Sequence, residues 1–359
     1  MRISMNRLRH FVLLLLVSLC LVVACQSRPP ETANTPQGAT TPTETPVLIN
    51  GAGATFPLFL YQRWFKEYQT LHPEVQVNYQ PIGSAAGIQQ VISKTIDFGA
   101  SDVAMTDEEI AKVESGVVLL PMTAGGVAVA YNLPGVENLK LSREALSEIF
   151  LGTITQWNDP KLIALNPDLE LPDLSIIVVY RSDGSGTTAV FTNHLAAINP
   201  SWSEAVGTGL NVNWPAGVGV KSNEGVSAQI QQEPGTIGYV EYSYAQELGL
   251  TVAALENQTG NFVSPNVVSM TAALNAVEMP DDLRVFIADP PIAEAYPIVT
   301  YSWILAYQTY EDPATAKALR EVLTWSLQEG QQFSESLGYV PLPTAIVDKV
   351  VKAIDRIKP

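Results

Sequence analysis

The chain has 359 residues and carries 36 acidic against 20 basic side chains, which gives a formal net charge of −16. A protein this acidic offers no broad basic surface to a polyanion, so we expect no nucleic-acid partner. Its length is sufficient for two domains of ordinary size.

The N-terminus predicts a signal peptide over residues 1–24. Three arginines precede an apolar run at 11–24, which is shorter than the roughly 20 residues that a spanning helix needs. The residues VVAC at 22–25 end this run, and small or apolar residues directly before a cysteine resemble the lipobox of bacterial lipoproteins. We therefore expect Cys25 to be lipidated and to become the first residue of the mature chain. The alternative is ordinary cleavage nearby, with Cys25 incidental.

Residues 25–46 predict a lipidated cysteine followed by a tether rich in Pro and Thr. At ~3.1 Å per residue, the tether could extend roughly 65 Å from a membrane. Cys20 would leave with the signal peptide and Cys25 would carry lipid, so the mature chain would have no disulfide, thiol nucleophile or thiolate metal site. Loss of residues 1–24 removes three arginines and no acids, which lowers the net charge to −19.

The globular part begins near Val47 and alternates short apolar runs with helical periodicity. Strands are expected at 47–50, 75–79 and 96–102, and helices at 57–72, after Ser84, and from Thr106 with a capping-box pattern. Strands that alternate with helices predict α/β layers with a largely parallel sheet. The helix at 57–72 carries an apolar stripe that we expect in the core: Pro57, Leu60, Tyr61, Trp64, Phe65 and Tyr68.

A second α/β unit is predicted after residues 123–132. It contains a strand at 174–180, the loop RSDGSGTT at 181–188 and a helix over 186–198. Further apolar segments lie at 235–245 and 296–308, and a helix is predicted over 313–337. The sequence has no internal repeat of fixed period.

Three loops share one character: GAGATFP at 51–57, GSAAG at 83–87 and DGSGTT at 183–188. Each follows a predicted strand, contains small residues and hydroxyls, and opens a helix. Helix N-termini leave backbone N–H groups unpaired and carry partial positive charge, so they bind anions. In α/β sheets such loops gather at the carboxyl ends of the strands, where ligands bind. Together they predict an oxyanion site.

Several side chains would complete this oxyanion site. Arg181 supplies a forked and permanently charged donor, whereas Asp102, at the end of its strand, places a carboxylate in an anion site. The neutral hydroxyl donors would be Thr55, Ser84, Ser185 and Thr187.

Catalysis is the weaker interpretation. DGSGT is not the G-x-S-x-G elbow of serine hydrolases, no lysine follows the glycines as in a P-loop, and GAGATF lacks the third glycine of a dinucleotide fingerprint. His194 lies nine residues beyond Ser185, roughly 13 Å along one helix, too far to act as its base. His72 is expected on the surface at a helix end. Because no His, Asp and Glu cluster has metal-ligand spacing, we predict neither a metal nor a catalytic residue.

These motifs, together with NWPAGVGVKSNEGVSAQIQQEPGTIGYVEY at 213–242, resemble the periplasmic phosphate-binding proteins of ABC uptake systems (PstS type) from about residue 48 to the C-terminus. The resemblance implies a two-lobed α/β Venus-flytrap fold of the periplasmic-binding-protein kind, with the ligand in the cleft between the lobes. The first lobe would comprise 47–123 and 303–359, the second lobe 131–296, and the hinge crossovers 124–130 and 297–302.

The resemblance also implies the ligand residues. Ser84 is followed by two alanines where the family more often has Ser or Gly, but this departure affects the neighbouring loop and not Ser84 itself. Asp183 would orient Arg181 from behind. The residues implied to bind phosphate are Ala54, Thr55, Phe56, Ser84, Asp102, Arg181, Ser185, Gly186 and Thr187.

Asp102 is expected to determine selectivity. An ionised carboxylate only accepts hydrogen bonds; phosphate near neutral pH still carries an O–H, whereas sulfate does not. Sulfate would therefore meet an unpaired, repelling carboxylate. The alternative is that Asp102 caps the following helix or pairs with a lysine outside the cleft.

The function implied by the resemblance is that of a binding protein and not an enzyme. It would be an extracytoplasmic lipoprotein, periplasmic or at the cell surface, that delivers inorganic phosphate to an ABC permease and ATPase. We expect a monomer that is attached to the membrane through lipid and needs no cofactor. The alternatives are a protein for another tetrahedral oxyanion such as sulfate or molybdate, a phosphate-ester hydrolase, and a surface sensor without a transporter.

Overall fold

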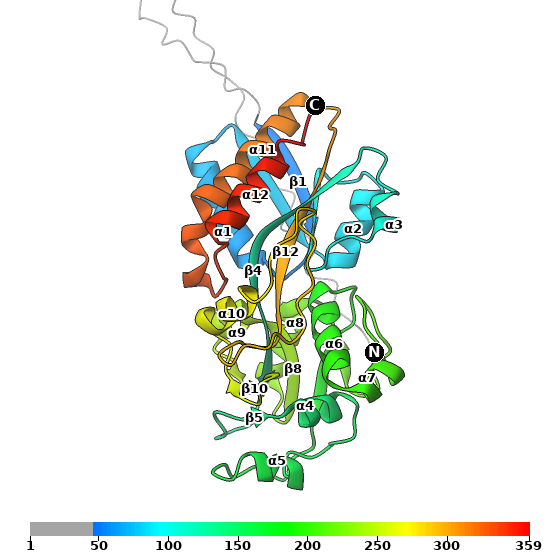
Figure 1. Cartoon of the computed structure of the whole chain (residues 1–359), viewed down its shortest axis with the longest axis vertical. Coiled ribbons are helices and arrows are strands. Elements are labelled where there is room, and N and C mark those ends of the chain that lie inside the picture. The colour runs from blue at the N-terminus through cyan, green and yellow to red at the C-terminus, as the bar shows by residue number, and fades with distance from the viewer. Residues whose placement is uncertain (1–45) are drawn as a thin grey trace, which may run out of the picture. The chain divides into compact units, whose positions relative to one another are not determined.

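A computed structural model describes residues 46–359 of the chain (Figure 1). The predicted signal peptide, the lipidated Cys25 and the tether lie outside these residues. No helix in the described range combines the length and the apolar character that a membrane crossing requires.

The first part of the chain follows the predicted alternation of strands and helices. The predicted stripe of α1 is buried, and Pro57 occupies the N-cap position of that helix. Thr106 forms the predicted capping box with Glu109 at the start of α3. The elements are β1 (Val47–Gly53), α1 (Leu58–Leu71), β2 (Val75–Pro81), α2 (Ser84–Ile92), β3 (Phe98–Ser101) and α3 (Asp107–Ile110).

The middle of the chain forms the second α/β unit. It includes β6 (Ile177–Arg181), α6 (Gly186–Ile198), α8 (Ser222–Gln232), β8 (Thr236–Glu241) and α9 (Tyr242–Leu248). The other elements of this part are β5 (Lys140–Leu141), α4 (Arg143–Phe150), α5 (Pro160–Leu165), α7 (Pro200–Ala205), β7 (Val218–Val220), β9 (Thr251–Val252), β10 (Ala254–Glu256), β11 (Phe262–Val263) and α10 (Val267–Leu274).

Two long strands connect these parts. β4 (Val117–Tyr131) pairs with β12 (Val299–Tyr307) over residues 117–126 and then with β8 over residues 127–131. Figure 1 shows β4 and β12 running side by side between the region of α1 and the region of α6, α8 and α9. We call the part around β1, β2 and β3 the first lobe and the part around β6, β7 and β8 the second lobe.

The main sheet has the strand order β2-β1-β3-β12-β4-β8-β6-β7, with β9 beside β4. Its two outer portions are parallel, but β12 runs antiparallel to β3 and β4, and β4 runs antiparallel to β8. The prediction of a largely parallel sheet is therefore right for each lobe and wrong for the centre. The crossing strands β4 and β12 do not belong to helix-connected β-α-β units, which is what imposes parallel pairing. A separate small sheet has the order β11-β10-β5.

The C-terminal segment returns to the first lobe as α11 (Pro313–Gln328), two 3₁₀ turns at Gly330–Phe333 and Glu335–Leu337, and α12 (Thr344–Ile354). The helix predicted over 313–337 therefore ends earlier than expected. The Gly330 carbonyl accepts a hydrogen bond of 2.7 Å from the Trp64 indole. A Cβ at Gly330 would lie 2.6 Å from the same ring. The close packing of Trp64 against the backbone at Gly330 coincides with the break in the helix.

Candidate functional site

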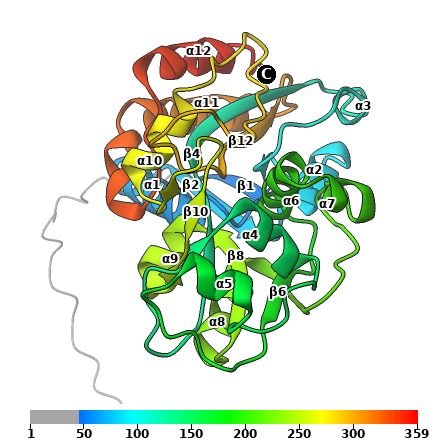
Figure 2. The ribbon, with the colours of Figure 1, turned by 60° about the horizontal axis from the view of Figure 1, so that its bottom comes forward.

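The three predicted loops converge between the lobes. The Ala85 N–H at the start of α2 donates to the Gly184 carbonyl at 3.0 Å, and the Arg181 Nη1 lies 3.3 Å from the Thr55 hydroxyl. A Cβ at Gly186 would be 2.5 Å from the Ser84 Oγ, so only glycine allows this approach. Figure 1 and Figure 2 both show α2 and α6 next to each other. The long-range arrangement expected from sequence is thus present.

The GAGATFP loop is held by hydrogen bonds to its backbone. The Ala54 N–H donates to the Ala100 carbonyl at 2.9 Å, and the Ala54 carbonyl accepts from the Tyr79 hydroxyl at 2.6 Å. The Thr55 carbonyl accepts from the Tyr244 hydroxyl at 2.7 Å. Because the polar groups of the Ala54 peptide are committed in this way, Ala54 shapes the loop through its backbone.

Arg181 is buried, and Asp183 binds its guanidinium through two hydrogen bonds. Its Nε and Nη2 donate to the two carboxylate oxygens of Asp183 at 2.7 and 2.5 Å. Burial would raise the pKa of Asp183, but the hydrogen bonds and charge of Arg181, together with the Ser222 N–H, lower the pKa below its usual value. A guanidinium has five N–H donors, and those on Nη1 and Nη2 not directed at Asp183 or Thr55 remain available for an anion.

The start of α6 supplies neutral donors. Ser185 is the N-cap residue, and its hydroxyl accepts from the Thr188 N–H at 3.1 Å. The N–H groups of the first helical residues have no partner within the helix. The Thr187 hydroxyl is fully buried and has no hydrogen-bond partner among the described residues. A buried hydroxyl without a partner is costly unless a ligand satisfies it.

Ser84 is fully buried and is the first residue of α2. The structure refines its predicted place near the N-cap: Gly83 is the N-cap, with a φ of 95°. A Cβ at Gly83 would lie 2.8 Å from the Asp183 Oδ2, so glycine is needed here both for the backbone angle and for the approach of the second lobe.

Asp102 is buried at the end of β3. Its Oδ1 accepts from the Ser302 hydroxyl at 2.9 Å, and its Oδ2 lies 3.4 Å from the Ser84 hydroxyl. Burial raises the pKa of Asp102 from 3.8 to about 7, although Ser302, Arg181 and Ser84 oppose this shift. The following helix is capped by Thr106, and no lysine of the described residues pairs with Asp102. Both alternatives considered for Asp102 are therefore wrong.

Sequence reasoning did not identify three buried groups that complete the site. Asn223, at the start of α8, donates to the Thr55 hydroxyl at 2.8 Å. Ser302 anchors Asp102 from β12, next to a register irregularity in the pairing of β12 with β4. Glu241 ends β8 and is fully buried, and the charge of Asp102 contributes to raising its pKa. Asn223 and Glu241 lie within residues 213–242, the segment that resembles the phosphate-binding proteins. That resemblance is the only feature of the sequence that could have pointed to them.

Within residues 46–359, the two histidines do not contribute catalytic groups to the site. His72 is the C-cap residue of α1 with an exposed side chain, as expected. His194 is buried in α6, and burial lowers its pKa to about 3. The described part of the chain contains no cluster of His, Cys, Asp and Glu that could hold a metal ion. The arrangement can bind and orient a small oxyanion.

Comparison with known proteins gives a family match over most of the chain. Residues 37–329 match the model of a PBP superfamily domain. The chain is 43% identical over 306 residues to the phosphate-binding protein PstS of Pasteurella multocida (strain Pm70), covering 84% of this chain and 88% of that protein. It is 39% identical over 339 residues to PstS of Methanocaldococcus jannaschii, covering 87% of each chain.

Solved structures share the fold. A high-affinity periplasmic phosphate-binding protein bound with phosphate, PfluDING, superposes with a TM-score of 0.68 at 22% identity, over 85% of this chain and 93% of that chain. A putative phosphate ABC transporter substrate-binding protein from Clostridium perfringens, with bound phosphate, gives a TM-score of 0.60 at 16% identity, over 83% and 100%. These likenesses support the two-lobed α/β fold predicted from the sequence.

Proposed function

We propose that this chain, which belongs to the PstS family of phosphate-binding proteins, captures inorganic phosphate outside the cytoplasm and delivers it to an ABC importer. Its relatives are named for phosphate binding. The observation that carries the proposal is the buried Thr187 hydroxyl, which has no hydrogen-bond partner within residues 46–359 and lies at the start of α6, in the loop that also presents Arg181. A tetrahedral oxyanion satisfies both groups at once.

The proposed ligand residues come from both lobes. The first lobe contributes Thr55, Phe56, Ser84 and Asp102, with Ala54 shaping their loop through its backbone, and the second lobe contributes Arg181, Ser185, Gly186 and Thr187. Direct contacts between the two sets, such as Thr55 with Arg181, support a ligand held between the lobes. Because the ligand touches donors of both lobes, it stabilises the closed arrangement.

Hinge motion would take place near 124–130 and 297–302, with lobes at 47–123 plus 303–359 and at 131–296. The change of partner strand along β4, between residues 126 and 127, supports the first of these positions. Small-angle scattering with and without phosphate tests the motion, since an identical radius of gyration in both conditions would contradict it.

We also propose that Cys25 carries the membrane anchor, which keeps the binding protein near its importer. Lipid supplies the attachment, because a cleaved signal peptide cannot. In cells, Cys25→Ser should release the protein from the membrane fraction or leave it unprocessed. Unchanged fractionation and migration of the variant would contradict the anchor.

The deciding experiment is calorimetric titration of the purified protein with phosphate, sulfate and molybdate. We expect phosphate to bind most tightly, with one site per chain. Stronger binding of sulfate or molybdate would assign another oxyanion. A parallel phosphatase assay, with and without divalent metal ions, tests the hydrolase alternative, and turnover of a phosphate ester would overturn the assignment as a binding protein.

A further inference from the structure

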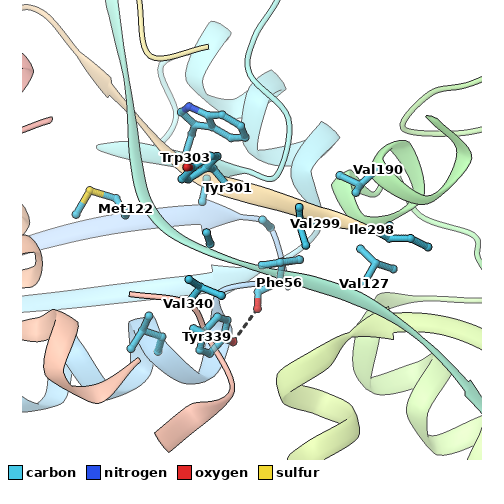
Figure 3. Packing of buried hydrophobic residues seen from close by; sticks show 14 of the residues in the cluster. Phe56, Met122, Val127, Val190, Ile298, Val299, Tyr301, Trp303, Tyr339 and Val340 are labelled. Atoms are coloured by element: carbon cyan, nitrogen blue, oxygen red, sulfur yellow. Dashed lines mark hydrogen bonds between the residues drawn. The ribbon is translucent and has the colours of Figure 1, made fainter. Parts of the chain in front are cut away.

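A buried row of oxygen atoms crosses the junction of the lobes beside the ligand loop. It begins at Glu241, the last residue of β8, and ends at the carbonyl of Phe56 in the GAGATFP loop. Between them lie the hydroxyls of Ser243 in α9 and of Tyr339, which follows the second 3₁₀ turn of the C-terminal segment. Figure 3 shows the last link, with the Tyr339 hydroxyl directed at the Phe56 carbonyl.

The row consists of direct contacts between oxygen atoms, and the two links that Tyr339 makes have ordinary hydrogen-bond distances. The Glu241 Oε2 contacts the Ser243 hydroxyl and accepts from the Ser243 N–H at 2.9 Å. The Ser243 Oγ lies 2.9 Å from the Tyr339 hydroxyl, which lies 2.8 Å from the Phe56 carbonyl oxygen. The neighbouring Val340 N–H donates to the Ala124 carbonyl of β4 at 2.8 Å, which fixes Tyr339 at the crossing strand.

The number of hydrogens available to the row indicates the protonation state of Glu241. The side-chain row has three links, and the Phe56 carbonyl at its end only accepts. The two hydroxyls provide one hydrogen each, so an ionised Glu241 would leave one link without a hydrogen. A proton on Glu241 supplies the third: Glu241 then donates to Ser243, Ser243 donates to Tyr339, and Tyr339 donates to Phe56.

The surroundings of Glu241 favour this neutral form. Its side chain is fully buried, and its Oε1 has no hydrogen-bond partner among the described residues. This Oε1 lies near the Phe56 ring, because both are within 3.3 Å of the position that a Cβ on Gly125 would occupy. Burial raises the pKa of Glu241 well above its usual value, although hydrogen bonds from Ser243 and from the Tyr244 N–H oppose this shift, and the charge of Asp102 adds to the rise. The other titratable groups coupled to Glu241 are the buried or half-buried phenols of Tyr242, Tyr244 and Tyr339.

We propose that Glu241 is a protonated positioning residue whose hydrogen-bond relay through Ser243 and Tyr339 links the second lobe to the backbone of the ligand loop and stabilises the closed form. The Tyr244 hydroxyl already holds the adjacent Thr55 carbonyl. With both carbonyls engaged, the Thr55–Phe56 segment is fixed relative to the second lobe. This inference rests on the proposed phosphate-binding function.

The first test compares three variants in phosphate titrations and in stopped-flow dissociation. Tyr339→Phe removes one hydroxyl and both links that it makes. Glu241→Gln keeps a neutral group that can donate to Ser243, although it cannot fully replace the cap at the start of α9. Tyr310→Phe is the matched control, because its hydroxyl also donates to a backbone carbonyl, that of Asp97 at 2.7 Å, within the first lobe.

We expect Tyr339→Phe to weaken phosphate binding about fivefold to tenfold, mainly through faster dissociation, since a net hydrogen bond contributes roughly 1 kcal/mol and the Ser243–Tyr339 link joins the two lobes. Glu241→Gln and Tyr310→Phe should remain within about threefold of the parent. If Glu241→Gln loses as much affinity as Tyr339→Phe, a neutral donor at this position does not sustain the relay, and the proposal is wrong. If Tyr339→Phe matches the Tyr310→Phe control, the row does not stabilise closure.

The second test does not depend on phosphate binding. Infrared spectra are recorded on the parent and on Glu241→Gln well above pH 7, where Asp102 has ionised in the absence of ligand. The carbonyl stretch of a protonated carboxyl should be present in the parent and lost in the variant; its absence from the parent overturns the inference. If the parent showed this band but did not bind phosphate, the proposed function would fail while the protonated Glu241 remained established.

Discussion

Asparagine in place of Asp102 removes the buried carboxyl of the site and keeps its size. Burial raises the pKa of this carboxyl from 3.8 to about 7, which corresponds to roughly 4 kcal/mol at about 1.4 kcal/mol per pKa unit. Between these two pH values the unfolded chain has released the proton and the folded chain retains it. The free energy of unfolding of the ligand-free protein therefore decreases as the pH rises from about 4 to about 7, and this contribution is constant above that range.

The same proton determines sulfate binding. Below its pKa, Asp102 can donate a hydrogen bond to sulfate, whereas the ionised form can only repel it. Each bound sulfate must then take up one proton above about pH 7, so sulfate affinity should fall about tenfold per pH unit there. Phosphate carries its own O–H, so its affinity should decrease much less over the same pH range. In Asp102→Asn the amide can turn its N–H towards sulfate at any pH, so discrimination should be weak and constant.

Two measurements test this reasoning on the parent and on Asp102→Asn. Urea unfolding of the phosphate-free proteins between about pH 4 and pH 8 should show the variant gaining stability relative to the parent as the pH rises, by up to about 4 kcal/mol. Competition titrations with phosphate and sulfate give the selectivity. A stability difference that does not change with pH, together with equal rejection of sulfate by both proteins, would refute the assignment of Asp102 as the selectivity residue.

Three further predictions concern the donors and the charge of the site. Arg181→Ala should weaken phosphate binding at least roughly tenfold in calorimetric titration, since hydrogen bonds to charged groups contribute about 1.5–3 kcal/mol; unchanged affinity would move the site elsewhere. Thr187→Val should lower affinity about fivefold without loss of stability in urea, because the hydroxyl has no partner in the described part of the chain; lower stability would mean a structural role. Added salt should leave the association rate unchanged or raise it, because the chain carries a net charge of −16 and repels anions; a steep decrease would reveal steering by exposed cations.

The ligand loops could be predicted because their signals are local. A strand, a short run of Gly, Ser and Thr, and a helix start can be read from adjacent residues, and the loop at 181–188 also contains Arg181 and Asp183. The capping box at Thr106 and the buried stripe of α1 are local patterns of the same kind. The positions of these elements follow from short-range hydrogen bonding and from the helical period.

The supporting groups could not be predicted from local pattern because they come from distant parts of the sheet. Ser302 reaches Asp102 across 200 residues of sequence, and Asn223 reaches Thr55 across 168. In the sequence, a serine within an apolar strand gives no indication of the loop that it contacts. The antiparallel centre was missed for a related reason: β4 and β12 alternate with helices in the chain, but their pairing depends on which edges meet in space.

The charges of the site are compatible with anion binding by so acidic a protein. Arg181 is the cation of the site, and Asp183 balances most of its charge through two hydrogen bonds, so that the pair presents oriented N–H donors more than net positive charge. Asp102 adds a carboxyl that tolerates the ligand only when one proton is shared between them. We therefore expect affinity to come from oriented N–H and O–H donors, those of Arg181 included, which are fixed before binding and weakly screened by salt. We expect the same arrangement to provide selectivity, because an anion without a proton would meet an acceptor that it cannot satisfy.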